Sequence, residues 1–214
     1  MARHLRAGVV VGAALLMAAA VPAAARAEGF AIALEGGYYD MTNASKSAKA
    51  VFDGSSGGFT YGAFLRTGLG RSWFVGAGAR MFRKDGERAF AADKDSPAFT
   101  LGHPLKVRVL PVYALLGYRL SPDASFSPYV GAGVGFTSYH EESTVAGETF
   151  EQSATKASFH GVLGAEYGRG HVRFGVEGMF STAPNTLGQG GISQVYEEKD
   201  AGGFSVVGRI ILVP

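Results

Sequence analysis

Histidines and glycine-rich runs are the residues whose type and spacing could support metal or cofactor chemistry. Four histidines follow the first 27 residues, namely His103, His140, His160 and His171. None belongs to an H-E-x-x-H or similarly close pair, the spacing that would suggest a zinc site, so we expect no metal. The densest polar cluster, His140-Glu141-Glu142, is typical of a solvated strand end that enters a loop.

The run Gly131-Ala132-Gly133-Val134-Gly135 resembles a dinucleotide-binding turn only superficially. It lacks the x-x-G spacing and the following helix pattern that such a turn requires, so we expect strand glycines and no cofactor. The chain has no cysteine, which excludes disulfides, thiol nucleophiles and thiolate metal sites.

The first 27 residues have the pattern of a secretory signal peptide. Basic residues precede an apolar run from Ala7 to Val21, and Ala25-Arg26-Ala27 forms an A-x-A cleavage site. We therefore expect a leader over residues 1–27 and one mature domain over residues 28–214. Without the three arginines of the leader, 17 basic residues face 18 acidic ones, so the charge gives no argument for nucleic-acid binding.

Eight segments alternate between apolar and polar or small residues, and such alternation predicts β-strands. Each is long enough for the roughly 9–11 residues of a tilted membrane strand. No segment beyond the leader has 18 consecutive apolar residues, so a membrane role must use strands. The predicted strands are 29–41, 57–69, 73–83, 105–120, 127–140, 155–167, 171–183 and 202–213.

The connections between these segments alternate in length. Residues 70–72, 121–126 and 168–170 are short and turn-like, whereas the other four connections are long and polar. Short periplasmic turns and long extracellular loops are the layout of outer-membrane barrels. The predicted long loops are 42–56, 84–104, 141–154 and 184–201.

The two faces of each predicted strand differ in polarity. Around Arg173 and Glu177, one face carries charged and small residues, and the other carries Val172, Phe174 and Val176. The sequence therefore predicts an eight-stranded antiparallel barrel with a lipid-facing exterior and a lumen filled by paired charges. The residues predicted to form this lumen network are Glu35, Arg66, Arg80, Arg119, Glu166, Arg173, Glu177 and Arg209.

Aromatic residues gather near the ends of the predicted strands, where girdles at the two membrane interfaces are expected. The predicted interface aromatics are Tyr38, Tyr61, Trp73, Phe82, Tyr118, Tyr129, Tyr139, Tyr167 and Phe180.

Two strand phrases, Pro111–Arg119 and Ser127–Phe136, resemble the small outer-membrane β-barrel family that includes opacity-type and OmpA-like domains. The resemblance implies export to the bacterial outer membrane, with membrane lipid, lipopolysaccharide and the barrel-assembly machinery as partners. It also implies a structural or surface-interaction role, with the loops as the place to contact a surface ligand.

Three alternatives stay open at this point. The lumen could be a narrow conduit for small or apolar solutes. Lipid A hydrolases are barrels of similar size that use a histidine, a serine and a glutamate, which this chain offers in Ser138, His140 and Glu141, although strand parity directs Ser138 and His140 toward lipid. A periplasmic lipocalin-like barrel would instead place apolar residues inside.

Overall fold

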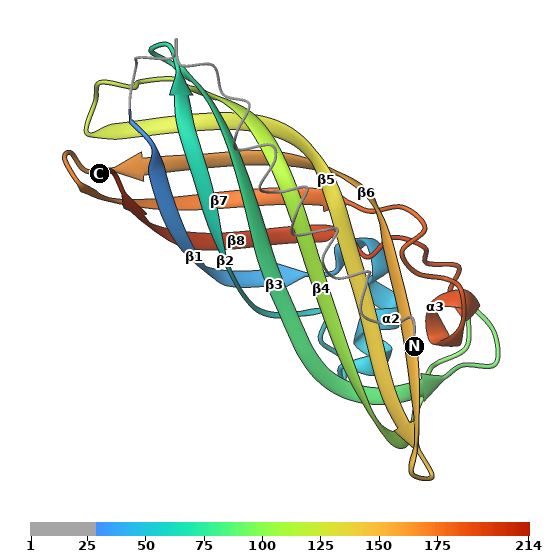
Figure 1. Cartoon of the computed structure of the whole chain (residues 1–214). Coiled ribbons are helices and arrows are strands. Elements are labelled where there is room, and N and C mark those ends of the chain that lie inside the picture. The colour runs from blue at the N-terminus through green and yellow to red at the C-terminus, as the bar shows by residue number, and fades with distance from the viewer. Residues whose placement is uncertain (1–28) are drawn as a thin grey trace, which may run out of the picture.

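Eight antiparallel strands close into a barrel in which every strand pairs with its sequence neighbours and β8 pairs with β1 (Figure 1). The computed structural model describes residues 29–214, so the predicted leader lies outside the described residues. The strands are β1 (Ala31–Asp40), β2 (Gly57–Leu69), β3 (Trp73–Phe90), β4 (Phe99–Arg119), β5 (Phe126–Val145), β6 (Glu148–Tyr167), β7 (Val172–Thr182) and β8 (Gly203–Leu212).

The barrel exterior is apolar and its interior holds polar groups. Along β8 the burial alternates at every residue, with Arg209 buried inside and Val206 and Ile210 exposed outside. This polarity is the opposite of the lipocalin-like alternative and suits a barrel surrounded by lipid. No helix among residues 29–214 is long and apolar enough to cross a membrane.

The four central strands are much longer than the sequence pattern predicts. Strands β3 to β6 have 18–21 residues, whereas β1, β2, β7 and β8 have 10–13. The predicted loops 84–104 and 141–154 are therefore wrong for most of their length, because β3–β4 and β5–β6 continue as paired hairpins. Above a membrane both faces of a hairpin can meet water, so polar residues there do not imply a loop.

The turn between β5 and β6 consists of Ala146 and Gly147, with positive φ angles of 51° and 86°. Two left-handed residues are what a type I′ hairpin turn requires. The tight turn keeps the strands paired to their tips.

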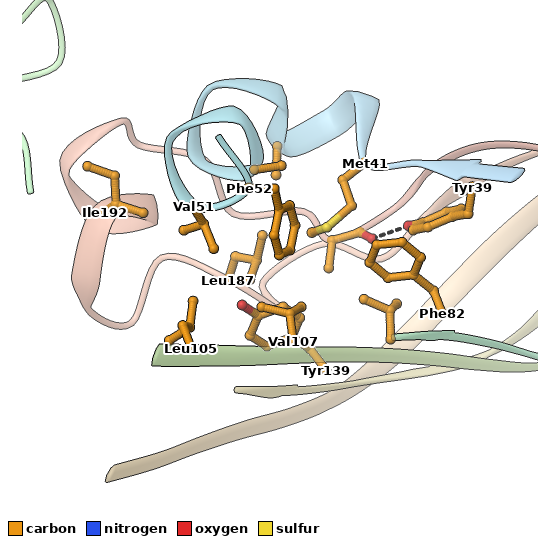
Figure 2. Close-up of a cluster of buried hydrophobic side chains, with 14 of the residues drawn as sticks. Tyr39, Met41, Val51, Phe52, Phe82, Leu105, Val107, Tyr139, Leu187 and Ile192 are labelled. Atoms are coloured by element: carbon orange, nitrogen blue, oxygen red, sulfur yellow. Dashed lines mark hydrogen bonds between the residues drawn. The ribbon is translucent and has the colours of Figure 1, made fainter. Parts of the chain in front are cut away.

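The remaining two long connections, 42–56 and 184–201, fold into a cap at the long-hairpin end of the barrel. They contain a short 3₁₀ helix (η1, Thr42–Ala44) and the helices α2 (Ser45–Val51) and α3 (Gly191–Val195). The cap packs on the inward faces of the extended strands and forms a buried apolar cluster with them (Figure 2). This cluster includes Met41, Val51, Phe52, Phe82, Leu105, Val107, Tyr139, Leu187 and Ile192.

Below the cap, large side chains in the lumen fit because glycines lie opposite them. A Cβ atom added to Gly117 would lie 2.1 Å from the Phe74 ring, and one added to Gly76 would lie 2.3 Å from the Phe64 ring. The glycine-rich alternation of the sequence therefore makes room for bulky residues on neighbouring strands.

Candidate functional site: a charge network inside the barrel

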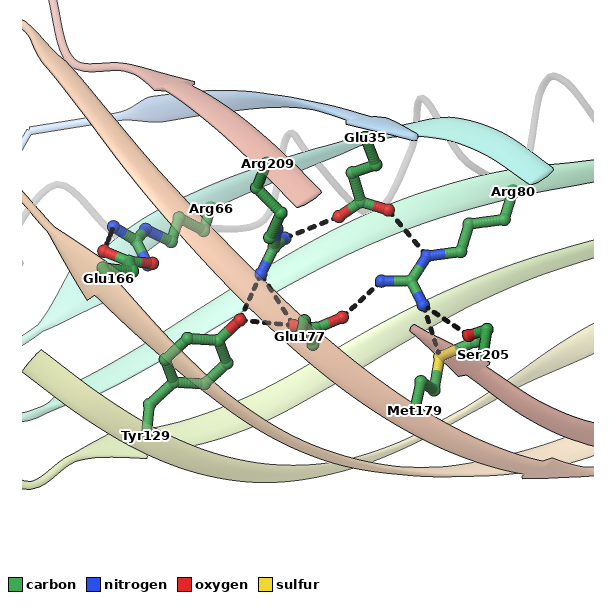
Figure 3. Close-up of polar contacts among 9 residues, drawn as sticks. All are labelled: Glu35, Arg66, Arg80, Tyr129, Glu166, Glu177, Met179, Ser205 and Arg209. Carbon is green, nitrogen blue, oxygen red and sulfur yellow. Dashed lines mark hydrogen bonds and ion pairs between the residues drawn. The ribbon is translucent and has the colours of Figure 1, made fainter. Parts of the chain in front are cut away.

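Four charged side chains from β1, β3, β7 and β8 meet in the lumen (Figure 3). Arg80 donates through Nε to Glu35 Oε2 at 2.6 Å and through Nη2 to Glu177 Oε1. Arg209 lies 2.7 Å from Glu35 Oε1 and 2.6 Å from Glu177 Oε2, measured from Nη2 and Nη1 respectively. Each arginine thus contacts both glutamates, and we call these four residues the charge network.

The charge network is buried and electrically balanced. None of its members is more than 6% exposed, and two positive charges face two negative ones. Burying an unpaired charge would cost several kcal/mol, so the mutual pairing is what allows these residues to lie inside. In addition, Arg80 Nη1 donates to Ser205 Oγ at 3.0 Å, and hydrogen bonds join Tyr129 to both Glu177 and Arg209.

A second ion pair, between Arg66 and Glu166, lies in the same lumen and is bidentate. Aromatic rings stack against the guanidinium groups: Arg209 lies 4.8 Å from the Phe64 ring centroid, and Arg66 lies 5.5 Å from that of Phe74. Such cation–π contacts offset part of the desolvation cost. The lumen core is therefore built from charges and aromatic rings together.

All eight charged residues predicted for the lumen point inward, but they do not form one network. Glu35, Arg80, Glu177 and Arg209 come together, and Arg66 with Glu166 forms the separate pair. Arg119 is almost fully buried with its guanidinium 5.9 Å from the Phe74 ring centroid, and Arg173 is half-buried near the start of β7.

Three of the predicted interface aromatics are wrong. Phe82, Tyr129 and Tyr139 are 2%, 0% and 5% exposed and point into the barrel. Tyr129 belongs beside the charge network, and the other two belong to the cluster under the cap. Strand parity decides their side, whereas position near a strand end does not. The remaining six lie on the outer surface: Tyr38, Tyr61, Trp73, Tyr118, Tyr167 and Phe180.

The predicted Ser138, His140 and Glu141 set is not assembled. Ser138 and His140 share the outward face of β5, and Ser138 accepts a hydrogen bond from Thr155 at 3.3 Å. Glu141 lies on the opposite face, where it accepts a 2.7 Å hydrogen bond from the Tyr139 hydroxyl.

Another hydroxyl–imidazole pair occurs inside the lumen. Ser158 Oγ and His160 Nε2 are 2.9 Å apart and both residues are buried. Ser158 and His160 are two residues apart on β6, so strand parity alone would have placed them on the same face. A nucleophile and its base need access to substrate, and this pair is enclosed by the packed lumen. Within residues 29–214 no group of three acidic or histidine side chains could hold a metal ion.

Sequence reasoning also missed two acidic residues that organise the cap. Glu198 accepts hydrogen bonds from the backbone N–H groups of Lys46 and Ser47 at 3.0 and 2.8 Å. Asp200 accepts from Asn43 at 3.1 Å and from the N–H of Ala183 at 2.7 Å. The contacts with Lys46, Ser47 and Asn43 join parts of the chain more than 150 residues apart in sequence, so no local motif marks them.

The model of the outer membrane protein beta-barrel domain family matches residues 11–182 of this chain. With the closed ring of eight strands and its apolar exterior, this match places the chain in that family, as a bacterial outer-membrane β-barrel protein. Among curated proteins no sequence matches the chain.

Solved structures of similar fold include three small barrels. Neisserial surface protein A is 11% identical with a TM-score of 0.53, over 86% of this chain and 96% of that one. Ail, the attachment invasion locus protein of Yersinia pestis, solved with the heparin analogue sucrose octasulfate, is 11% identical with a TM-score of 0.51, over 87% and 98%. A major outer membrane protein from Thermus thermophilus is 9% identical with a TM-score of 0.50, over 86% and 99%. At these identities the likeness concerns the fold.

Proposed function

We propose that this barrel is a sealed, non-enzymatic anchor that holds its cap and long hairpins at the cell surface for contact with a surface ligand. The observation that carries the proposal is the charge network, which joins β1, β3, β7 and β8 across the lumen (Figure 3). An eight-stranded barrel is just wide enough to be filled by side chains.

The packing around the network supports a closed lumen. The hollow beside Arg66 and Glu166 has no space for a water molecule. The hollow between Arg80 and Phe82 has a volume of about 10 Å³, near the minimum that one water needs. A conduit for small or apolar solutes would require the network to open.

The surface role is supported by the order of the cap and by what the hairpins expose. Glu198 and Asp200 fix the two cap segments against each other. At the tip of the β3–β4 hairpin, Phe90 and Phe99 are about half exposed, with ring centroids 5.5 Å apart. Exposed apolar residues held on a rigid scaffold are suited to protein or ligand contact.

Conductance across planar lipid bilayers tests the seal. We expect the wild-type protein to produce no steady current steps in potassium chloride. A variant with Arg80→Ala and Glu177→Ala removes two large side chains while preserving neutrality, and should conduct if the network is the seal. Steady conductance by the wild-type barrel would refute the sealed anchor and favour the conduit.

Surface exposure of the hairpins can be tested because the chain has no cysteine. Lys94→Cys places a single thiol in the β3–β4 connection, and Arg169→Cys places one in the turn between β6 and β7. A membrane-impermeant maleimide should label the first in intact cells and the second only after permeabilisation. The reverse pattern would contradict the proposed orientation.

A further inference from the structure

Three adjacent strands carry a basic residue at the same place on the outer surface. On β3, β4 and β5 the outward side chains are uncharged over a nine-residue stretch, and the first titratable one beyond it is basic. These residues are Arg83, Arg108 and His140, which we call the basic row. The outward side chains are uncharged over residues 73–81, 110–118 and 130–138, and Arg80 in the first of these ranges points into the lumen.

The register places the basic row side by side. Arg83 is the partner of Arg108 across β3 and β4, and Arg108 is the partner of His140 across β4 and β5. Directly opposed residues have Cβ atoms about 4.5–5.5 Å apart, and like charges so placed are destabilising. An anion bound between the two arginines would relieve this repulsion.

No carboxylate of residues 29–214 forms a salt bridge with this pair, and the outward Asp85 of β3 lies opposite Lys106 in the register. Neither Arg83 nor Arg108 takes part in a salt bridge there, and both are exposed. One step further from the apolar band, Lys106 is 3.6 Å from Glu142. Lys106 thus has a carboxylate partner within the chain, whereas Arg83 and Arg108 are open to an external partner.

The basic row is confined to one side of the barrel. The outward faces of β1, β2, β6, β7 and β8 carry no basic residue in the described chain. A ring of positive charge would indicate general attraction to anionic lipid, whereas a single row fits one bound molecule. Below it, Val134 and Phe136 are more than half exposed and offer an apolar surface for acyl chains.

The depth of the row identifies the source of the anion. A tilted strand crosses the hydrocarbon region with about 9–11 residues. An outward side chain two residues beyond nine residues with uncharged outward side chains therefore lies at the headgroup level. The short turns lie at the other end of the barrel, which is the periplasmic end in outer-membrane proteins. The row consequently faces the outer leaflet.

We propose that Arg83, Arg108 and His140 bind a phosphate group of one lipopolysaccharide molecule in the outer leaflet, whose acyl chains lie along β4 and β5. Guanidinium groups bind phosphate through paired N–H donors, and two of them from neighbouring strands can hold the same group. This site lies outside the barrel, so it does not depend on whether the lumen conducts.

The test compares binding of diphosphoryl lipid A with binding of chemically dephosphorylated lipid A to the folded protein in detergent micelles, counted by native mass spectrometry. We expect the wild type to prefer the phosphorylated lipid by about tenfold or more, since hydrogen bonds to charged groups are strong. The double variant Arg83→Gln with Arg108→Gln should lose that preference. The matched control, Lys94→Gln with Arg169→Gln, removes two exposed cations elsewhere and should keep it.

Heat-dependent migration in electrophoresis shows that each variant is folded before binding is measured. Equal binding of the two lipids by the wild type, or an equal loss in the control variant, would overturn the proposal. Inorganic phosphate should compete weakly. If it displaced the lipid at equimolar concentration, the row would be a general anion site and the lipid assignment would be wrong.

Discussion

Replacing Glu177 by glutamine tests whether the charge network stabilises the barrel as a balanced unit. Glu177 accepts hydrogen bonds from Arg80, from Tyr129 at 2.7 Å and from Arg209 at 2.6 Å. Glutamine keeps the volume but removes the charge, so two buried arginines would face Glu35 alone. Breaking a buried pair by removing one partner costs about 3–5 kcal/mol, and we expect a loss of this size in the free energy of unfolding.

The assay is urea unfolding in lipid vesicles followed by fluorescence, because Trp73 is the only tryptophan and lies on the outer surface. The double variant Glu177→Gln with Arg209→Gln restores neutrality. Its loss in the free energy of unfolding should be smaller, by about 1–3 kcal/mol, than the sum of the losses of the two single variants. Glu148→Gln, at an exposed hairpin tip, should change stability by less than about 0.5 kcal/mol. A loss below about 1 kcal/mol for Glu177→Gln would refute the reasoning.

Three further predictions concern the cap, the lumen glycines and a loop carboxylate. Asp200→Ala removes the acceptor that holds the cap, so limited proteolysis should cut within 184–201 while the strands stay protected. Gly117→Ala should lower the stability measured by urea unfolding by about 1–3 kcal/mol because of the Phe74 ring, with partial recovery on adding Phe74→Leu. Backbone hydrogen bonds lower the pKa of Asp93, so its carboxyl NMR signal should titrate below the usual value near 3.9. The turn that follows Asp93 is therefore stabilised by the ionised carboxylate at neutral pH. It loses this stabilisation only when the pH falls through the lowered pKa of Asp93.

The strand number, the closed antiparallel ring and the side of each buried charge could be predicted from the sequence. A period of two assigns a side to every residue of a strand once one residue is placed. The same rule would have placed Tyr129 inside, since it shares parity with Gly131 and Gly133. The error came from using nearness to a strand end as a guide to the interface.

The length of the hairpins and the structure of the cap could not be predicted in this way. Residues 84–88 are mostly charged because they lie in water, and polar composition is shared by loops and by exposed strands. The ion-pair partners inside the lumen could not be predicted from the sequence either. Parity gives the side of Arg80, but only the closed ring shows that Glu35 and Glu177 reach it while Glu166 pairs with Arg66.

The cap lies across the junction where the first and last strands meet. Its segments leave β1 and β7, and the contacts from Ser47 to Glu198 and from Tyr39 to the carbonyl of Ala201, at 2.5 Å, join one side of the β1–β8 seam to the other. Both bonds join segments that lie together where β1 pairs with β8. Opening the seam would then require the cap to unpack first, so the cap should slow unfolding of the finished barrel far more than it speeds assembly.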